Sequence, residues 1–311
     1  MVDLHTHSNI SDGELSPELL IKKAAAQGLS AIALTDHDTI NGLETAEKAA
    51  LIYPSFRFIP GIEVNINWVT SKYKRFGSHN VPGIGPGGEF HLLGLGINSP
   101  SPAFLNAIHK LTLRREERNL EIIDKMHELS LITVKNQADI ENVLKELTDI
   151  AGGSSRGHLI GRPHFAAFLL KNKMVKSINQ AFTRYLGVGK PLYAPKEGLI
   201  FEEAVAIIRE SGGIPVLAHP ISLYIAWGRL PDLIKILKDM GLAGLEAWHP
   251  TTKPRSCRRL EALAKSLGIY VTEGSDYHGS FRPDRLLGYS GIGRAINDSI
   301  LEAIPELKDK V

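Results

Sequence analysis

Short apolar segments that lead into a histidine or a carboxylate recur along this sequence and alternate with segments of helical periodicity. Val2 to Leu4 leads into His5, and Ile214 to Ala218 leads into His219. Strands that alternate with helices are typical of βαβ units and of a mainly parallel sheet. The carboxyl ends of such strands meet at one rim, where barrel enzymes keep their active sites, so we expect these polar side chains to lie together.

The middle of the chain departs from this alternation. From Ser101 to about Lys196 the pattern is helical, with a long amphipathic segment from Phe104 to Leu129 and no convincing strand. The order of segments predicts an α/β barrel formed by residues 1–100 and 197–311. A helical cap domain at residues 101–196 interrupts it.

Composition and charge exclude several classes of protein. The 311 residues carry a formal net charge of +2, which does not predict binding to a long nucleic acid. The single cysteine, Cys257, allows no intrachain disulfide and no cysteine-based structural zinc site. No segment approaches the ~20 apolar residues of a transmembrane helix, and the N-terminus has no signal-peptide pattern. We therefore expect a cytoplasmic enzyme with no membrane association and no evident obligate protein partner.

Metal-binding residue types gather in five motifs at or near predicted strand ends. These are His5-Thr6-His7, Asp36-His37-Asp38, Glu63, His219-Pro220 and Asp276-Tyr277-His278. Each is common by chance, and Asp36-His37-Asp38 alone could be a helix-capping turn. Glu63 is more informative, because a carboxylate in apolar surroundings is costly to bury without a metal or a cation beside it. Histidine and carboxylate mixtures suit Zn, Mn or Fe, and several acidic ligands favour Mn or Fe.

Seven short segments, in this order along nearly the whole chain, carry a family resemblance. They are His5-Thr6-His7, Ser11-Asp12-Gly13, Thr35-Asp36-His37-Asp38, Gly61-Ile62-Glu63, His91-Leu92-Leu93-Gly94, Leu217-Ala218-His219-Pro220 and Gly274-Ser275-Asp276-Tyr277-His278. With these segments the sequence resembles the polymerase-and-histidinol-phosphatase (PHP) family of metal phosphoesterases. The resemblance implies a distorted (β/α)7 TIM-like barrel with two to three divalent metal ions in a trinuclear centre. Manganese is expected there before iron or zinc.

The resemblance also implies which residues hold each metal. The first metal would be held by His5, His7, Glu63 and Asp276, the second by Glu63, His91 and His219, and the third by Asp12, His37 and His278. Glu63 would thus bridge two metals. A metal pair of this kind activates a water molecule and holds the phosphoryl oxygens for in-line attack.

Within the family, the sequence is most similar to the branch with a helical insertion that acts on nucleotides. The segments that carry this likeness are Glu117-Arg118-Asn119, Gly161-Arg162-Pro163-His164, Ala181-Phe182-Thr183-Arg184-Tyr185-Leu186-Gly187 and Gly212-Gly213-Ile214-Pro215-Val216-Leu217-Ala218-His219-Pro220. The likeness implies a substrate bound between barrel and cap, with Arg118 and Arg162 as phosphate contacts.

Four side chains are further candidates for substrate contacts or catalysis. Arg162 opens a predicted helix, whose N-terminus binds anions readily. Arg118 is equally compatible with a solvated helix face, because charged residues surround it. His249 ends a predicted strand and could protonate a leaving group, contact the substrate or support a metal ligand from behind. Lys190 is a candidate phosphate contact without a P-loop pattern around it.

The glycine-rich segment from Ser71 to Gly88 departs from the branch, because it is longer than the pattern expects. It lies between Glu63 and His91, so we expect a lid or a loop that selects the substrate. His91 precedes its apolar run instead of ending it. A hairpin that reverses the chain would bring it to the rim of the barrel.

The function predicted from the sequence is hydrolysis of a phosphate monoester of a small nucleotide, by Glu63, His219, His249 and Arg162 with metal-activated water. The expected group is the 3′-phosphate of a nucleoside 3′,5′-bisphosphate. Alternatives are a 5′-3′ exonuclease on short oligoribonucleotides, which needs only a few basic contacts, and a histidinol phosphate phosphatase. A metal-bearing module without activity is disfavoured, because all nine predicted ligand positions hold competent residues.

Overall fold

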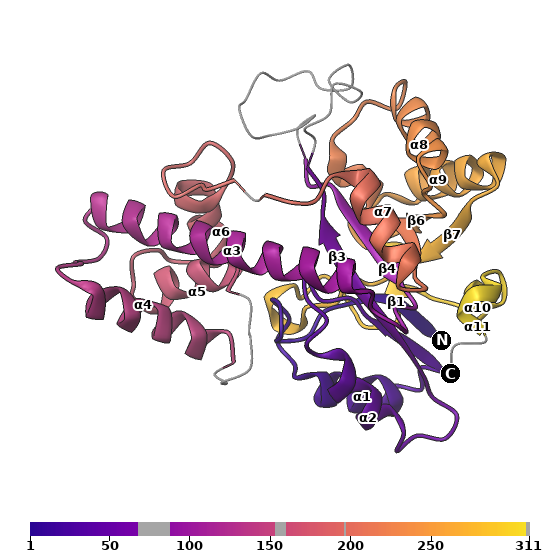
Figure 1. Cartoon of the computed structure of the whole chain (residues 1–311), viewed down its shortest axis with the longest axis horizontal. Coiled ribbons are helices and arrows are strands. Elements are labelled where there is room, and N and C mark those ends of the chain that lie inside the picture. Colours follow the sequence, from indigo (N-terminus) through magenta and orange to yellow (C-terminus); the bar gives the residue numbers. More distant parts are fainter. Residues whose placement is uncertain (68–87, 153–159, 196, 309–311) are drawn as a thin grey trace.

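The computed structural model describes residues 1–67, 88–152, 160–195 and 197–308. Seven strands form the main sheet (Figure 1). They are β1 (Val2–Thr6), β2 (Ala31–Leu34), β3 (Arg57–Asn65), β4 (His91–Leu95), β5 (Ile214–Leu217), β6 (Gly244–Trp248) and β7 (Tyr270–Glu273). A separate hairpin pairs β8 (Tyr289–Ser290) with β9 (Arg294–Ala295).

The strands lie in sequence order and curl into a distorted barrel, as predicted. All neighbouring pairs are parallel except that β4 runs antiparallel to both β3 and β5. Beyond the end of β7 the chain returns to β1, where the Asp276 amide donates to the His5 carbonyl at 2.8 Å and the His7 amide donates to the Tyr277 carbonyl at 3.0 Å. The barrel therefore closes at its carboxyl rim.

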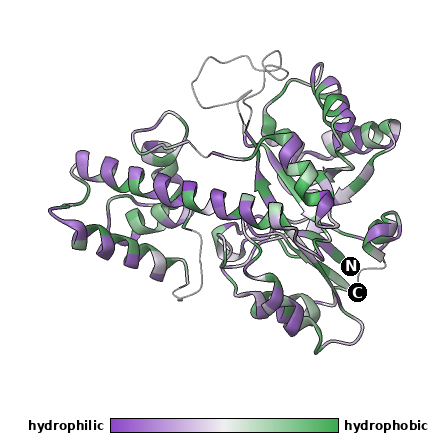
Figure 2. Cartoon of the chain, viewed as in Figure 1, coloured by the Kyte–Doolittle hydropathy of each residue, from purple (hydrophilic) through white to green (hydrophobic). Residues whose placement is uncertain are grey.

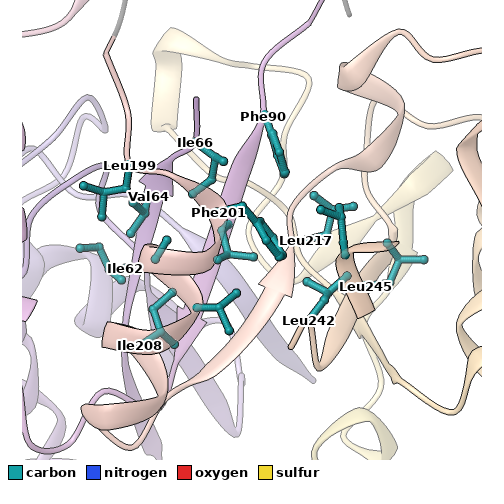
Figure 3. Close-up of a cluster of buried hydrophobic side chains, with 14 of the residues drawn as sticks. Ile62, Val64, Ile66, Phe90, Leu199, Phe201, Ile208, Leu217, Leu242 and Leu245 are labelled. Carbon is teal, nitrogen blue, oxygen red and sulfur yellow. The ribbon is translucent and has the colours of Figure 1, made fainter. Parts of the chain in front are cut away.

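Alternating side chains divide each strand between two hydrophobic layers. Ala31 and Ala33 of β2 pack in the barrel interior, whereas Ile32 and Leu34 pack against helices outside. The outer layer on the opposite side is built around Phe201, which is stacked on Phe90 with ring centroids 5.7 Å apart (Figure 3). The same alternation of successive side chains between the two faces of a strand places Glu63 on the inner face of β3.

Helices surround the sheet and carry both polar and apolar residues, as amphipathic helices do (Figure 2). Those around the barrel are α1 (Pro17–Ala26), α2 (Leu43–Ala50), α7 (Phe201–Glu210), α8 (Leu230–Asp239), α9 (Pro254–Leu267), α10 (Ser299–Glu302) and α11 (Pro305–Lys308). Ser16 caps α1 by accepting from the Leu19 amide, and Pro17 is its first residue. Leu301 of α10 and Leu307 of α11 pack with the interior residues of the barrel.

A helical segment projects to one side of the barrel (Figure 1). It comprises α3 (Pro102–Glu128), α4 (Gln137–Ile150), α5 (Arg162–Lys171), α6 (Ile178–Ala181) and a π-helical turn (Phe182–Leu186). The first half of α3 packs in the barrel's outer core through Phe104 and Leu111, and its second half packs in a separate core through Ile122 and Met126. One helix thus joins both cores, and the division into domains at residues 101 and 196 stays a prediction.

β3 continues through Pro60: it pairs with β2 up to Pro60 and with β4 from Gly61 onward. Of the glycine-rich segment from Ser71 to Gly88, all but Gly88 lies outside the described residues. Among the residues that are described, no helix is both long and apolar enough to cross a membrane.

We predict that Phe201→Ala destabilises the protein by about 3–5 kcal/mol, because it removes a fully buried ring and leaves a cavity in the outer core. Urea unfolding followed by circular dichroism measures the effect. Leu51→Ala, at a side chain that is 80% exposed, is the control and should change stability little. Equal stability of the two variants would contradict the packing described above.

Candidate metal centre

The residues that the sequence singles out meet at the carboxyl rim of the barrel. Glu63 lies on β3 and His91 on β4, and the other side chains come from β1 or from the turns that follow the parallel strands. His91 begins β4, and its register opposite Asn65 brings it to the same rim because β4 is antiparallel. The hairpin expected from the position of His91 is confirmed.

One group of donor atoms surrounds the Oε2 oxygen of Glu63. His5 Nε2 lies 3.3 Å and His7 Nε2 lies 3.2 Å from this oxygen. Asp276 Oδ1 lies 3.5 Å from His5 Nε2 and 3.2 Å from His7 Nε2. Four donor atoms thus converge, as the ligands of one divalent ion would.

The Oε1 oxygen of Glu63 faces different partners. His91 Nδ1 and His219 Nε2 each lie 2.9 Å from it, and these two nitrogens are 3.3 Å apart. The two oxygens of one carboxylate therefore belong to two neighbouring groups of donors. This arrangement suits a carboxylate that bridges a pair of metal ions.

A third group lies at the outer edge of the cluster. Asp12 places one oxygen 3.3 Å from His278 Nε2 and the other 3.9 Å from His37 Nε2. His37 Nδ1 also lies 3.0 Å from Glu63 Oε2, so this group adjoins the first. All nine predicted ligand residues are brought together in this way, and their roles as ligands stay a prediction.

The electrostatics of the cluster fit a divalent cation. His5 Nε2, His7 Nε2 and Glu63 Oε2 are buried and have no hydrogen-bond partner among the described residues. Burial alone would lower the pKa of His7, but Asp276 and Glu63 raise it to about 9. Burial would raise the pKa of Glu63, but the surrounding histidines hold it well below its usual range. A cation that binds here would displace protons from the histidines.

The backbone around the cluster is unusual. Asp38, His219 and Asp276 have φ angles of 53°, 26° and 50°, in the left-handed region. Such conformations cost about 1–3 kcal/mol each for residues other than glycine and concentrate at functional sites. At Gly274 a Cβ atom would lie 2.3 Å from His5 Cβ, so only glycine lets the chain pass β1 this closely.

Two buried carboxylates support the histidines without belonging to the predicted ligand set. Glu246, within β6, lies 2.9 Å from His5 Nδ1. Asp36 accepts hydrogen bonds from Ser8 and Ser11 and thereby ties the turn after β1 to the turn after β2. The sequence signal that could have found Glu246 is the one that found Glu63, an acid inside an apolar strand.

His249 lies beside the cluster, as the sequence predicts. Its Nδ1 accepts from the Thr251 amide at 3.3 Å, which places its proton on Nε2, 3.1 Å from Asp276 Oδ2. Burial lowers the pKa of His249, and the hydrogen bond to Asp276 only partly offsets this effect. A neutral His249 therefore holds Asp276 in place.

Four arginines line the pocket above the cluster. They are Arg115 on α3, Arg162 on α5, and Arg282 and Arg285 in the segment after β7. Arg115 pairs with Asp38, and Arg285 pairs with Asp276. Arg162 Nη2 lies 3.1 Å from Glu89 Oε1. Planar guanidinium groups around a pocket favour an anionic ligand with several oxygens, such as a phosphate.

Two predicted phosphate contacts lie elsewhere. Arg118 is buried and donates to the Asn119 side chain at 2.8 Å and to the Ile160 carbonyl at 3.3 Å, and it does not line the pocket. Arg115, three residues earlier on the same helix, lines the pocket instead. Lys190 is exposed and is not among the lining residues either. Arg162 is the predicted phosphate contact that the pocket includes.

The pocket opens into a wider cleft between the barrel rim and the helical segment. This cleft has a volume of about 970 Å³ and shares Asp12, His91 and Arg162 with the pocket. Its walls beyond the metal cluster combine polar residues with apolar and aromatic side chains. They include Ile178, Phe182, Val188, Tyr193, Tyr224 and Phe281.

Comparison with known proteins relates this arrangement to a family. The profile of the PHP domain matches residues 3–202. A 5′-3′ exoribonuclease from Haemophilus influenzae is 31% identical over 276 residues, which cover 89% of each chain. A 3′,5′-nucleoside bisphosphate phosphatase from Chromobacterium violaceum is 30% identical over 296 residues, which cover 93% of this chain and 91% of the relative.

A solved structure supports the fold. A protein from Bifidobacterium adolescentis, assigned as a metal-dependent phosphoesterase, superimposes with a TM-score of 0.76 and 24% sequence identity. The superposition covers 98% of this chain and 96% of the other. At this identity the likeness establishes the shared architecture of barrel and helical segment.

We predict that Glu63→Gln lowers the number of manganese ions that the protein retains after dialysis, measured by elemental analysis. An amide offers one good acceptor oxygen in place of two, so it cannot serve both donor groups. Glu273→Gln is a matched control, because Glu273 is equally buried but contacts Ser290 and Arg294. Unchanged metal content in the Glu63 variant would refute the bridging arrangement.

Proposed function

The chain belongs to the PHP domain family of metal-dependent phosphoesterases, and on that basis we propose that it hydrolyses a phosphate monoester of a small nucleotide. The preferred group is the 3′-phosphate of a nucleoside 3′,5′-bisphosphate. The observation that carries this proposal is the carboxylate of Glu63, whose two oxygens face two separate groups of donors below an arginine-lined pocket.

We assign three metal positions to these donors. His5, His7, Glu63 and Asp276 would hold the first, Glu63, His91 and His219 would hold the second, and Asp12, His37 and His278 would hold the third. Histidines mixed with carboxylates favour manganese or iron over a structural zinc site. Metals bound in this way lower the pKa of water and polarise phosphoryl oxygens.

The chain's own residues orient the substrate. Arg115 and Arg162 approach the pocket from the helical segment, whereas Arg282 and Arg285 approach from the barrel. Cationic side chains on two sides of the pocket suit a ligand with two phosphates. The apolar part of the cleft, with Phe182 and other aromatic rings, suits a nucleobase.

His249 has a supporting role in this proposal. Its Nε2–H is engaged by Asp276, so it fixes the orientation of a metal ligand. Its lowered pKa keeps the imidazole neutral near pH 7, with its one N–H engaged by Asp276.

A second candidate function is 5′-3′ cleavage of short oligoribonucleotides. The observation that favours it is the size of the cleft, because about 970 Å³ is at the upper end of small-molecule sites. Exposed aromatic side chains such as Tyr224, which is 75% exposed, can stack on further bases. Both functions use the same metal cluster and differ in how far the ligand extends along the cleft.

We predict that the manganese-loaded protein releases phosphate faster from adenosine 3′,5′-bisphosphate than from AMP, histidinol phosphate or a short 5′-phosphorylated RNA. Malachite green detection of phosphate, together with chromatography of the RNA products, measures this preference. Mononucleotides released from the RNA at the highest rate would move the assignment to the exoribonuclease. Histidinol phosphate as the best substrate would refute both nucleotide proposals.

We predict that Arg162→Ala raises KM for the best substrate roughly 10- to 100-fold, because a charge-assisted hydrogen bond to phosphate is worth about 1.5–3 kcal/mol. Lys190→Ala is the matched control, since Lys190 is exposed and outside the pocket. Steady-state kinetics of both variants measure the difference. If the two changes affect KM equally, Arg162 does not bind the phosphate.

A further inference from the structure

Glu246 is the one buried carboxylate of β6, and it contacts two of the histidines proposed as metal ligands. Its side chain is 1% exposed. Its Oε1 lies 2.9 Å from His5 Nδ1, and its Oε2 accepts from the backbone amide of His219 at 2.7 Å. No part of the proposed function uses Glu246 directly.

The contact to His5 determines which ring nitrogen is free. A carboxylate only accepts hydrogen bonds, so His5 Nδ1 carries the proton and donates to Glu246. The lone pair of His5 is then on Nε2, which lies 3.3 Å from Glu63 Oε2 and 3.5 Å from Asp276 Oδ1. Glu246 thus fixes the tautomer in which His5 can bind a metal ion.

The contact to His219 acts on the backbone. His219 has a φ angle of 26°, a conformation that the chain holds only if its surroundings stabilise it. The accepted hydrogen bond satisfies its amide, and the ring is directed so that Nε2 lies 2.9 Å from Glu63 Oε1. Glu246 therefore positions one histidine at each oxygen of the Glu63 carboxylate: His5 at Oε2 and His219 at Oε1.

The surroundings keep Glu246 in this position. A Cβ atom at residue 274 would lie 2.7 Å from Glu246 Oε1 and 2.3 Å from His5 Cβ. Glycine at this position therefore leaves the space that the side chains of Glu246 and His5 occupy. The neighbouring carboxylate on β7, Glu273, is engaged by Arg294 at 3.1 Å and Ser290 at 3.2 Å and cannot substitute for Glu246.

We propose that Glu246 is a positioning residue that couples the two metal positions on either side of Glu63, through the tautomer of His5 and the backbone of His219. This inference rests on the metal centre of the proposed function but not on the identity of the substrate. It requires both oxygens of the carboxylate, because each oxygen accepts from a different N–H donor.

The test compares Glu246→Gln with the matched control Glu273→Gln in the full-length protein. One amide oxygen cannot accept both hydrogen bonds, so Glu246→Gln should weaken manganese binding roughly 10- to 100-fold, the usual effect of losing a residue that supports a metal ligand. Titration calorimetry with manganese alone gives affinity and stoichiometry, and thermal unfolding monitored by circular dichroism gives stability. Glu273→Gln should bind manganese as the wild type does.

The outcomes separate the inference from the proposed function. Wild-type affinity and stoichiometry in Glu246→Gln would overturn the role of Glu246, whereas no manganese binding by the wild type would overturn the metal centre itself. Metal binding without hydrolysis of nucleotides would remove the substrate proposal and leave Glu246 untouched. If Glu246→Gln does not fold, Glu246→Asp decides, because a shorter carboxylate cannot reach both donors and should bind manganese more weakly than Glu273→Gln.

Discussion

The carboxylate of Glu63 is the group on which the rest of this site depends. It is 1% exposed, and burying a charge without compensation is among the most costly events in folding. Compensation comes from histidines on both of its oxygens, contributed by strands that are far apart in sequence. The strand order, the reversal at β4 and the left-handed turn at His219 all serve to bring these histidines to one carboxylate.

Much of this architecture could be predicted from the sequence. Apolar runs of strand length alternate with helical segments, and Glu63 stands out as an acid within an apolar run. His91 could be placed at the rim because a residue before an apolar run reaches the carboxyl ends of parallel strands only if its own strand is reversed. Local patterns were sufficient to place these two residues, because the direction of a strand and the alternation of its side chains depend on a few neighbouring residues.

The remaining site residues depend on packing that local patterns do not encode. Arg115 and Arg118 are three positions apart on α3 and therefore lie on similar faces, so a small rotation of the helix decides which one reaches the pocket. Ile122 and Met126, packed in the helical core, help to set that rotation, which puts Arg118 against the Ile160 carbonyl. Arg285 lies in an irregular segment without periodicity, and nothing in the sequence pairs it with Asp276.

The position of α3 also distinguishes two parts of the site. Its first half packs in the outer core of the barrel, and Arg115 on the same helix pairs with Asp38, beside His37. Arg115 is therefore held beside the metal cluster, whatever lies further out. Relatives named as an exoribonuclease and as a bisphosphate phosphatase both align over about nine-tenths of this chain. For this chain, the choice of substrate is therefore expected to depend on the cleft walls, where aromatic side chains can change without disturbing the buried charges around Glu63.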